Sequence, residues 1–528
     1  MGEIPEQFNA AEYFIDRHVA EGRGRKIAIE CGHERVSYDE LCSNVNRAGN
    51  AFRSVGLHIE QRIALVLNDT PDFAFSFFGA IKIGAVPVPL NTFLKPSDYE
   101  FMLNDCRARA IVISEELLPC LEEIRERLPY LSAVVVAGKQ VDRPYLKFSD
   151  LAAAQSTSLT PQRTTRDDPA FWLYSSGSTG QPKGCVHLQH DMSVAAEQYA
   201  KGTLCATEED RFFSVSKLFF AYGLGNGLYF PLALGATSIL WPGSAHPANV
   251  LGVIKEHRPT LLFSVPSSYS AILQHAASVP KSELSSVRFA VSAGEPLPAV
   301  IFQRFKDRFG IEILDGIGST EATHIFISNR PGAIRPGSTG QPVAGVEVRI
   351  LDDQDRPVPQ GEIGNLWAKS DAICERYWNR HELSKCTIQG EWISTGDKYW
   401  QDKDGFFWYA GRRDDMLKVS GVWVSPVEIE GVLAEHPDVA ESAVIAAADA
   451  DTLLKPHAYV VLREGREPSA ELAQALQDWV EQKLARYKRP RAIHFVASLP
   501  KTATGKIQRF ALRQRSRDGS SEPDAHSF

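Results

Sequence analysis

Residues Tyr174–Gly184 read YSSGSTGQPKG, a stretch rich in glycine and hydroxyl side chains that ends in a lysine. Glycine lets backbone N–H groups approach phosphate oxygens closely, and the short hydroxyls add further donors. Lys183 adds a mobile positive charge. The apolar run FWLY precedes the stretch, and GCVHLQHDMSVAAEQYA follows it with helical spacing. A strand, a glycine-rich turn and a second regular element are typical of a nucleotide-phosphate site, and a flexible surface loop is the alternative.

The position of the lysine distinguishes this loop from the Walker A motif. A P-loop NTPase needs Gly-Lys-Ser/Thr at the start of a helix, whereas Lys183 lies between Pro182 and Gly184. The proline is incompatible with a continuous turn from loop to helix. The sequence therefore disfavours a P-loop NTPase and predicts a different nucleotide site.

Composition limits the class of protein. A chain of 528 residues is too long for one hydrophobic core, so several subdomains are expected. The net charge of −8 argues against general nucleic-acid binding, and no apolar run is long enough to span a membrane. The eight cysteines are scattered without a CxxC pair, which predicts reduced thiols and a cytoplasmic protein.

The order of apolar and helical segments predicts an α/β fold. Up to about residue 318, strands such as RIALVLND and IEILDGIG alternate with helical stretches, which indicates parallel sheets. Residues 332–409 have short β segments and Gly/Pro turns, typical of a small β-barrel or a distorted sheet. We expect a large N-terminal domain (1–413) of two parallel-sheet α/β subdomains plus a small β-barrel subdomain. A small α+β C-terminal domain (414–515) and a disordered tail (516–528) follow.

A second informative segment is GIGSTEATHIF, which starts at Gly316. A predicted strand ends at Asp315, so Thr320 and Glu321 are expected at the carboxyl end of a parallel sheet, where α/β proteins bind ligands. A threonine hydroxyl can bond a phosphate oxygen, and a glutamate offers a hard oxygen to Mg²⁺. A helix start with a solvated acid is the alternative.

Further segments complete a pattern. SAGEPLP (292–298), STGDK (394–398), YAGRRDDMLKVSG (409–421) and PKTATGKIQR (500–509) follow in order. With the two segments above they resemble the motifs of the ANL superfamily of adenylate-forming enzymes. This superfamily contains acyl- and aryl-CoA synthetases, peptide-synthetase adenylation domains and beetle luciferases. Ile317 stands where the family usually has an aromatic residue.

The resemblance implies roles for individual residues. Those expected to bind ATP are Ser175, Ser176, Gly177, Ser178, Thr179, Gly180, Lys183, Gly294, Glu295, Pro296, Asp315, Gly316, Ile317, Thr320, Asp397 and Arg412. Glu321 is the expected Mg²⁺ ligand, and Asp397 the expected partner of the ribose hydroxyls. Lys506, Thr320 and Glu321 form the catalytic set, with Lys506 placed between the attacking carboxylate and the α-phosphate, where a cation reduces repulsion. Asp414 is the hinge about which the C-terminal domain is mobile, and Ser420 and Gly421 line the channel for CoA.

The acid is indicated by FFAYGLGN together with DGIGSTEATHIFISNR, which resemble the benzoate-CoA ligase group. The expected pocket for an aromatic ring comprises Phe220, Ala221, Tyr222, Gly223, Gly318, His324, Ile325 and Ser267. Ordinary core packing is the alternative for Tyr222 and His324. Ser267 is polar and could meet an ortho substituent or serve its own helix start, so benzoate and 2-aminobenzoate (anthranilate) both stay open.

The expected function is an aryl-CoA ligase of aromatic acid metabolism that uses ATP, Mg²⁺ and coenzyme A. An aryl carboxylate would form aryl-AMP and pyrophosphate, and CoA would then displace AMP. An adenylating enzyme that loads a carrier protein shares every motif. A luciferase-like oxygenase or a non-enzymatic adenylate-binding protein is more remote, since the second would usually lack Lys506, Glu321 or Asp397. Whether the chain forms a homodimer stays open.

Overall fold

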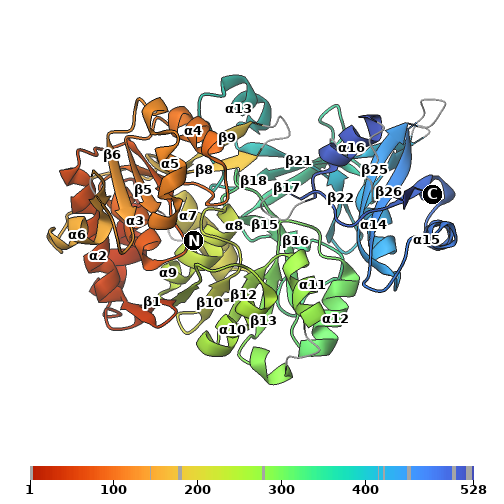
Figure 1. Cartoon of the computed structure of the whole chain (residues 1–528), viewed down its shortest axis with the longest axis horizontal. Helices are drawn as coiled ribbons and strands as arrows, with labels where there is room; N and C mark the ends of the chain where they lie inside the picture. The colour runs from red at the N-terminus through yellow and green to blue at the C-terminus, as the bar shows by residue number, and fades with distance from the viewer. Residues whose placement is uncertain are drawn as a thin grey trace.

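The computed structural model describes residues 4–142, 144–176, 181–275, 280–413, 415–419, 422–448, 454–501, 507–518 and 526–527. These residues form a large body and a smaller C-terminal lobe, drawn in blue at the right of Figure 1. Among them, no helix is both long and apolar enough to cross a membrane.

A five-stranded sheet forms one part of the body. Its order is β4-β3-β5-β6-β7 and every pairing is parallel. The strands are Val86–Pro89, Arg62–Val66, Ala110–Ser114, Ala133–Ala137 and Leu146–Lys147. The strands β4 and β5 are buried along their whole length, as expected where both faces of a parallel sheet are covered. The nearby helices are α2 (Tyr38–Ser54), α3 (Pro71–Lys82), α4 (Pro96–Asp105), α5 (Leu118–Glu122) and α6 (Phe148–Ala153).

A nine-stranded sheet forms a second part, with the order β16-β15-β14-β13-β12-β10-β11-β1-β2. The strands in that order are Gln341–Pro342, Ile325–Ser328, Ile313–Gly318, Phe289–Ser292, Leu261–Ser264, Arg211–Ser214, Thr237–Leu240, Ile27–Cys31 and Glu34–Ser37. The central strands from β14 to β1 pair in parallel. The expectation of two parallel-sheet α/β subdomains is confirmed, although β1 and β2 from the start of the chain join the later sheet.

Short helices connect the strands of the nine-stranded sheet. They are α7 (Asp191–Ala195), α8 (Ala221–Leu224), α9 (Phe230–Leu234), α10 (Pro247–His257), α11 (Pro266–His275) and α12 (Ala299–Phe309). A π-helical segment, Gly225–Tyr229, lies between α8 and α9. In Figure 1, α10, α11 and α12 lie together at the lower edge of the body.

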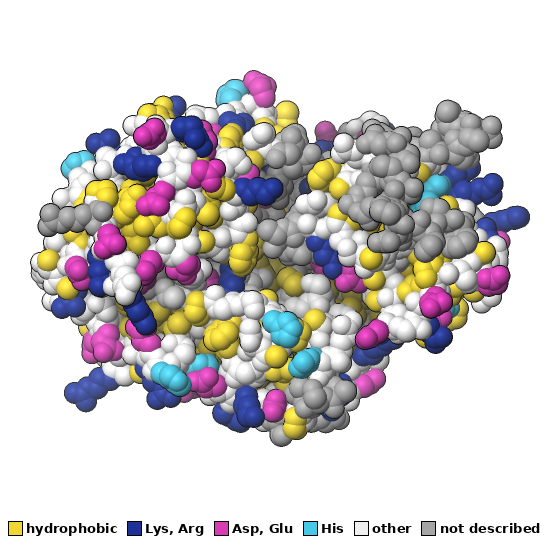
Figure 2. All heavy atoms as spheres, in the orientation of Figure 1, with side chains coloured by type: hydrophobic (Ala, Val, Ile, Leu, Met, Phe, Trp, Pro, Cys, Tyr) yellow, Lys and Arg dark blue, Asp and Glu magenta, His cyan; other side chains and the backbone are white. Residues whose placement is uncertain are grey.

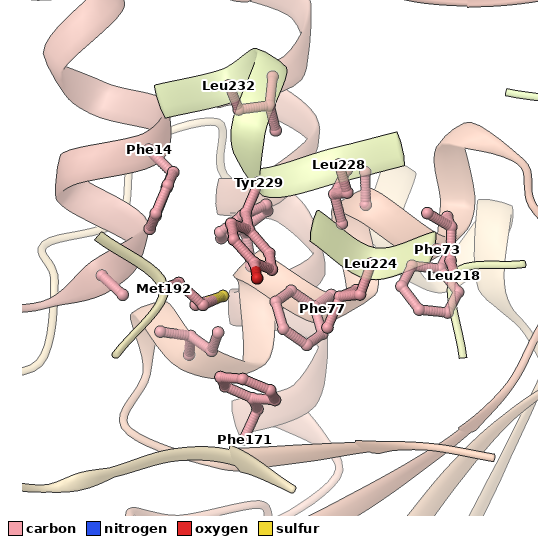
Figure 3. Close-up of a cluster of buried hydrophobic side chains, with 14 of the residues drawn as sticks. Phe14, Phe73, Phe77, Phe171, Met192, Leu218, Leu224, Leu228, Tyr229 and Leu232 are labelled. Atoms are coloured by element: carbon pink, nitrogen blue, oxygen red, sulfur yellow. The ribbon is translucent and has the colours of Figure 1, made fainter. Parts of the chain in front are cut away.

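One hydrophobic core joins distant parts of the body (Figure 3). In it, Phe77 of α3 packs against Phe171 of strand β8 (Pro169–Ser176), with ring centroids 5.7 Å apart. Phe14 from the N-terminal segment contacts Tyr229. The same core contains residues of both parallel sheets, such as Leu65 of β3 and Phe212 of β10, so burying it fixes the two sheets relative to one another.

Two antiparallel sheets complete the body. The strands β19 (Arg376–Tyr377), β9 (Pro182–Leu188) and β8 form one. The other contains β17 (Glu347–Leu351), β18 (Gly364–Lys369), β21 (Trp392–Gln401), β20 (Ile388–Gln389) and β22 (Phe407–Arg412). The sequence predicts a small β-barrel or a distorted sheet there. In the described part of the chain no pairing joins the edge strand β17 to β20 or β22, while an isolated bridge between Gly340 and Phe407 joins β22 to the segment before β16. This arrangement agrees with the distorted sheet.

The C-terminal lobe has its own core and sheet. Strands β25 (Val439–Ala448), β26 (Leu454–Leu462), β27 (Ala492–Phe495) and β28 (His526–Ser527) form the sheet, and helices α14 (Pro426–Ala434), α15 (Ala470–Lys483) and α16 (Arg509–Asp518) accompany it. A short hairpin, β23 (Leu417–Val419) and β24 (Val422–Val424), precedes α14. The sequence predicts a disordered tail over 516–528, yet α16 extends to Asp518 and β28 pairs with β27.

Candidate active site

A cleft of about 2090 Å³ is lined by residues of both the body and the C-terminal lobe. From the body it receives the ends of β8 and β14 and part of β21. From the lobe it receives residues of α14 and α16. Figure 2 shows the face on which the two parts of the molecule meet. Most of the predicted site residues that the structure describes line this cleft.

The glycine-rich loop connects two antiparallel strands. Ser175 of β8 lies opposite Lys183 of β9, so the loop is the tip of a hairpin. The sequence predicts helical spacing directly after the loop, but residues 182–188 are strand and the helix α7 begins only at Asp191. Residues Gly177–Gly180, four of the predicted phosphate ligands, lie outside the described part of the chain.

Glu321 is the centre of a polar network in this cleft. Ser175 donates a hydrogen bond to Glu321 Oε1 (3.0 Å), and the Tyr377 hydroxyl donates another (2.8 Å). The Lys183 ammonium forms an ion pair with the same oxygen at 3.2 Å and donates to the Tyr377 hydroxyl at 2.8 Å. Three different segments of the chain thus bring donors to one carboxylate oxygen.

The protonation of Glu321 follows from this network. Burial raises the pKa of the carboxyl, but the charge of Lys183 and the hydrogen bond from Tyr377 outweigh burial, so the pKa lies below its ordinary value. Burial and the Glu321 charge raise the pKa of Tyr377, which keeps its hydroxyl protonated as a donor. The network therefore holds an ionised carboxylate in a buried position.

Thr320 and Glu321 lie in a turn, residues 319–324, between β14 and β15. β14 pairs in parallel with β13 as far as Asp315 and then pairs with β15 in antiparallel register through Gly318. The turn therefore leaves the carboxyl edge of the parallel sheet, as the sequence predicts. The alternative, a helix start at this position, does not occur.

Two further segments expected to bind ATP converge on the same cleft. Gly294, Glu295 and Pro296 line it, as do Asp315, Gly316 and Ile317. The backbone N–H of Leu297 donates to Asp315 Oδ2 at 3.5 Å and so links the two segments. Burial raises the pKa of Asp315 well above its ordinary value.

Asp397 and Arg412 are partners on neighbouring strands. They lie opposite one another in β21 and β22, and Arg412 donates to Asp397 Oδ1 at 2.9 Å. Arg412 also donates to the Thr395 carbonyl at 3.0 Å, and all three residues line the cleft. The Asp397 charge raises the pKa of Arg412 above its ordinary value. The guanidinium thus fixes the Asp397 carboxylate at the wall of the cleft.

The predicted aryl pocket divides into an outer and an inner group. Phe220, Ser267 and Gly318 line the cleft. Tyr222 and His324 are absent from the described lining and stack on one another, with ring centroids 5.6 Å apart. This inner position agrees with the packing alternative for both residues.

The inner pair is held by backbone groups. The Tyr222 hydroxyl donates to the Val291 carbonyl (3.0 Å), and His324 Nε2 lies 3.3 Å from the Tyr222 carbonyl. Burial lowers the pKa of His324 to about 3, so its ring is neutral and Nε2 is the donor. His324 Nδ1 is buried without a hydrogen-bond partner among the described residues.

The remaining pocket residues have a steric role. Ala221 and Gly223 belong to α8, and a Cβ on Gly223 would come within 2.0 Å of the Lys217 carbonyl oxygen. A Cβ on Gly318 would lie 2.6 Å from the His324 carbonyl oxygen. Ile325, buried, pairs with Gly318 at the start of β15. Glycine is required at both positions because the opposing atoms are backbone.

Comparison with known proteins agrees with this geometry. The model of the AMP-binding enzyme family matches residues 16–378, and that of the AMP-binding enzyme C-terminal domain matches residues 428–506. This chain belongs to the AMP-binding enzyme family. The sequence-based expectation of an adenylate-forming enzyme is thereby confirmed.

Relatives within this family are similar over nearly the whole chain. A benzoate–CoA ligase of Thauera aromatica is 45% identical over 512 residues, which are 97% of this chain and 96% of that protein. A solved anthranilate CoA ligase in complex with anthranoyl-AMP has a TM-score of 0.93 and 43% identity, covering 97% of this chain and 98% of that one. A benzoate CoA ligase from Burkholderia xenovorans LB400 has a TM-score of 0.89 and 43% identity, covering 96% and 100%. The resemblance to the benzoate-CoA ligase group is confirmed.

Four predicted residues of this AMP-binding enzyme lie outside the part of the chain that the structure describes, and one residue of the cleft was not predicted from the sequence. Lys506, Asp414, Ser420 and Gly421 lie outside the described residues, so their expected roles stay predictions. Tyr377, by contrast, contacts both Glu321 and Lys183 but lies in no recognised motif. A lone tyrosine at the end of a two-residue strand gives no sequence signal for such a role.

Proposed function

We propose that this AMP-binding enzyme is an AMP-forming aryl-CoA ligase that joins an aromatic carboxylate, benzoate or 2-aminobenzoate, to coenzyme A. The observation that carries the proposal is the 45% identity to a benzoate–CoA ligase across 97% of the chain. The cleft supports it, because an ionised Glu321, a fixed Asp397 and an apolar wall at Phe220 face one space.

In the first half-reaction the aryl carboxylate oxygen attacks the α-phosphorus of ATP. An aryl-AMP anhydride forms and the bond to pyrophosphate breaks. Asp397, oriented by Arg412, would accept hydrogen bonds from the ribose hydroxyls. Ser175 and the loop that follows it would donate to the phosphates. Lys506 would lie between the carboxylate and the α-phosphate, where its charge offsets the repulsion of two anions.

The residues around Glu321 fit a magnesium ion. The carboxylate is ionised, oxygen ligands are what Mg²⁺ prefers, and Thr320 next to it offers a hydroxyl to a phosphate. When bound, Mg²⁺ would neutralise charge on the phosphates of ATP. Lys183, at 3.2 Å from Glu321 in the structure described here, could then turn toward the phosphates.

In the second half-reaction the CoA thiol attacks the acyl carbon of aryl-AMP. The thioester forms, AMP leaves, and the thiol proton is released. The C-terminal lobe would turn about Asp414, withdraw Lys506 and present Gly421 to the pantetheine arm. A carrier-protein thiol as acceptor in place of CoA is the alternative outcome, and cytoplasmic location and homodimer formation stay predictions.

The choice of acid would depend on the ring pocket. Phe220 and Gly318 line the cleft and would form the walls of this pocket, and the Tyr222–His324 stack would limit its depth. A flat ring fits such a slot, whereas a long aliphatic chain does not. Ser267 on the wall would favour an ortho amino or hydroxyl group on the ring.

A panel of acids tests the proposal. ATP–pyrophosphate exchange is measured with benzoate, 2-aminobenzoate, hydroxybenzoates and short aliphatic acids, and thioester release is then measured with CoA. Exchange with aryl acids only, followed by release of aryl-CoA, is the expected result. Exchange that is fastest with aliphatic acids contradicts the ring pocket. Adenylate formation without any thioester on CoA favours a carrier protein.

A further inference from the structure

Strand β9 contacts the turn 319–324 at two places. Alternate residues of a strand point to the same face, so Lys183, Cys185 and His187 share one face of β9. Lys183 meets Glu321, Cys185 packs with Cys374 and Tyr377, and the His187 ring reaches Thr323. One face of the strand thus contacts both Glu321 and Thr323.

Thr323 has a costly backbone conformation. Its φ is +62°, in the left-handed region that β-branched residues rarely adopt. Such a conformation persists only where the surroundings determine it, and it is typical of functional sites. The buried Thr323 hydroxyl donates to the Ala372 carbonyl at 2.5 Å and accepts from His187 Nδ1 at 3.0 Å. These two bonds compensate for the unfavourable φ and fix the turn.

His187 is itself fixed on three sides. Its Nδ1 lies 3.0 Å from Asp191 Oδ2, and both side chains are fully buried. Its ring stacks on Phe171, with centroids 4.7 Å apart and planes 11° apart. Nε2 is buried without a hydrogen-bond partner among the described residues, whereas Nδ1 lies within hydrogen-bond distance of both Asp191 Oδ2 and Thr323 Oγ1. The polar contacts of this ring therefore pass through Nδ1, whose N–H is shared between Asp191 and Thr323.

The segment 372–377 holds the turn from its other side. The backbone N–H of Cys374 donates to the Glu321 carbonyl at 2.7 Å, in addition to the Tyr377 bond to the Glu321 side chain. The turn thus lies between β9 and this segment, and His187 supplies the contact nearest to its strained residue.

We propose that His187, oriented by Asp191, is a positioning residue that holds the turn 319–324 through Thr323 and so places Glu321 for the metal–nucleotide complex. The proposal rests on the proposed function, in which Glu321 binds Mg²⁺. His187 touches no substrate, and its effect is exerted through the Thr323 hydroxyl.

Two substitutions of His187 form a matched pair. In His187→Asn the amide N–H₂ can occupy the place of Nδ1–H, whereas in His187→Gln it lies at the distance of Nε2. Both lose the stack on Phe171, so both should lower the thermal midpoint similarly. Thr323→Val is a second probe, since it keeps the branched shape and removes only the hydroxyl. Glu321→Gln serves as the reference for loss of the metal ligand.

The readout is the dissociation constant of ATP measured by calorimetry with Mg²⁺ and with EDTA. Wild type and His187→Asn should bind ATP more tightly with Mg²⁺. In His187→Gln and Thr323→Val, the increase in ATP affinity caused by Mg²⁺ should be about tenfold smaller than in the wild type. A loss of this size is typical when a residue that supports a metal ligand is removed. The affinity for ATP in EDTA should be alike in all four proteins.

The outcomes separate the two claims. If wild type gains affinity from Mg²⁺ and both His187→Gln and Thr323→Val keep the gain, the role of His187 is wrong while the proposed function stands. If His187→Asn loses as much as His187→Gln, the Nδ1 donor is not the cause and the proposal is overturned. If wild type gains nothing from Mg²⁺, the role of Glu321 fails and the proposal fails with it.

Discussion

The Tyr377 hydroxyl is the bridge between the two charged residues of the cleft, and Tyr377→Phe removes it. In the wild type this hydroxyl donates to Glu321 and accepts from Lys183, each at 2.8 Å. A hydrogen bond to a charged group contributes about 1.5–3 kcal/mol. Because Lys183 and Glu321 keep their own ion pair at 3.2 Å, the loss should lie at the lower end. At 1.4 kcal/mol per factor of ten, kcat/KM for ATP should fall about tenfold.

The pH dependence should change as well. Donation from Tyr377 is one cause of the lowered pKa of Glu321, so the substitution raises that pKa. The carboxylate is then protonated at a higher pH, and the acid limb of ATP–pyrophosphate exchange should move upward. The stability that the ionised Glu321 contributes is present above its unfolded pKa and is lost as the pH falls through the folded pKa.

The matched control is Tyr269→Phe, which removes an equally buried hydroxyl. Tyr269 donates to the Val291 carbonyl at 2.7 Å and is not bonded to Glu321 or Lys183. The thermal midpoint of the Tyr269→Phe variant should fall, but the acid limb of its ATP–pyrophosphate exchange should coincide with that of the wild type. If Tyr377→Phe has the same acid limb and the same kcat/KM as Tyr269→Phe, the network is not part of the nucleotide site and the reasoning is refuted.

Three further predictions address other parts of the site. Lys506→Ala should nearly abolish formation of aryl-AMP yet leave thioester formation from supplied aryl-AMP intact, and an equal loss of both steps contradicts the assigned role. Asp397→Asn should raise KM for ATP about tenfold through the weaker acceptor, with KM for the acid unchanged in steady-state kinetics. Gly318→Ala should destabilise by about 1–3 kcal/mol, since its Cβ would meet the His324 carbonyl at 2.6 Å. Gly252→Ala, in a helix with nothing within 4 Å, should instead stabilise by about 0.5–1 kcal/mol, and thermal melts distinguish the two.

The alternation of apolar and helical segments was enough to predict the two parallel sheets, because buried parallel strands are continuous apolar runs. It could not show that β1 and β2 join the sheet formed by later strands, since sheet order depends on pairing between distant segments. The segment after the glycine-rich loop has a sequence pattern that is compatible with either a strand or a helix. CVHLQ alternates well enough for β9, and the helical pattern begins at Asp191. Periodicity over so few residues does not separate the two.

The convergence of residues on one cleft could be predicted where they belong to recognised motifs. Lys183, Glu321, Asp397 and Arg412 all line one cleft, although they are spread over more than two hundred residues of sequence. Tyr377 was missed because its role depends on where β19 pairs with β9, and a lone tyrosine carries no such information. The left-handed φ of a residue in a turn, as at Thr323, is likewise invisible when the residue is not glycine.

Formation of an aryl thioester with release of AMP is the central reaction proposed for this enzyme. The purified protein is incubated with benzoate or 2-aminobenzoate, ATP, Mg²⁺ and CoA, and products are quantified by mass spectrometry and nucleotide chromatography. We expect aryl-CoA and AMP in equal amounts, with pyrophosphate and without ADP. Formation of ADP, or consumption of ATP without any aryl thioester, would contradict the account.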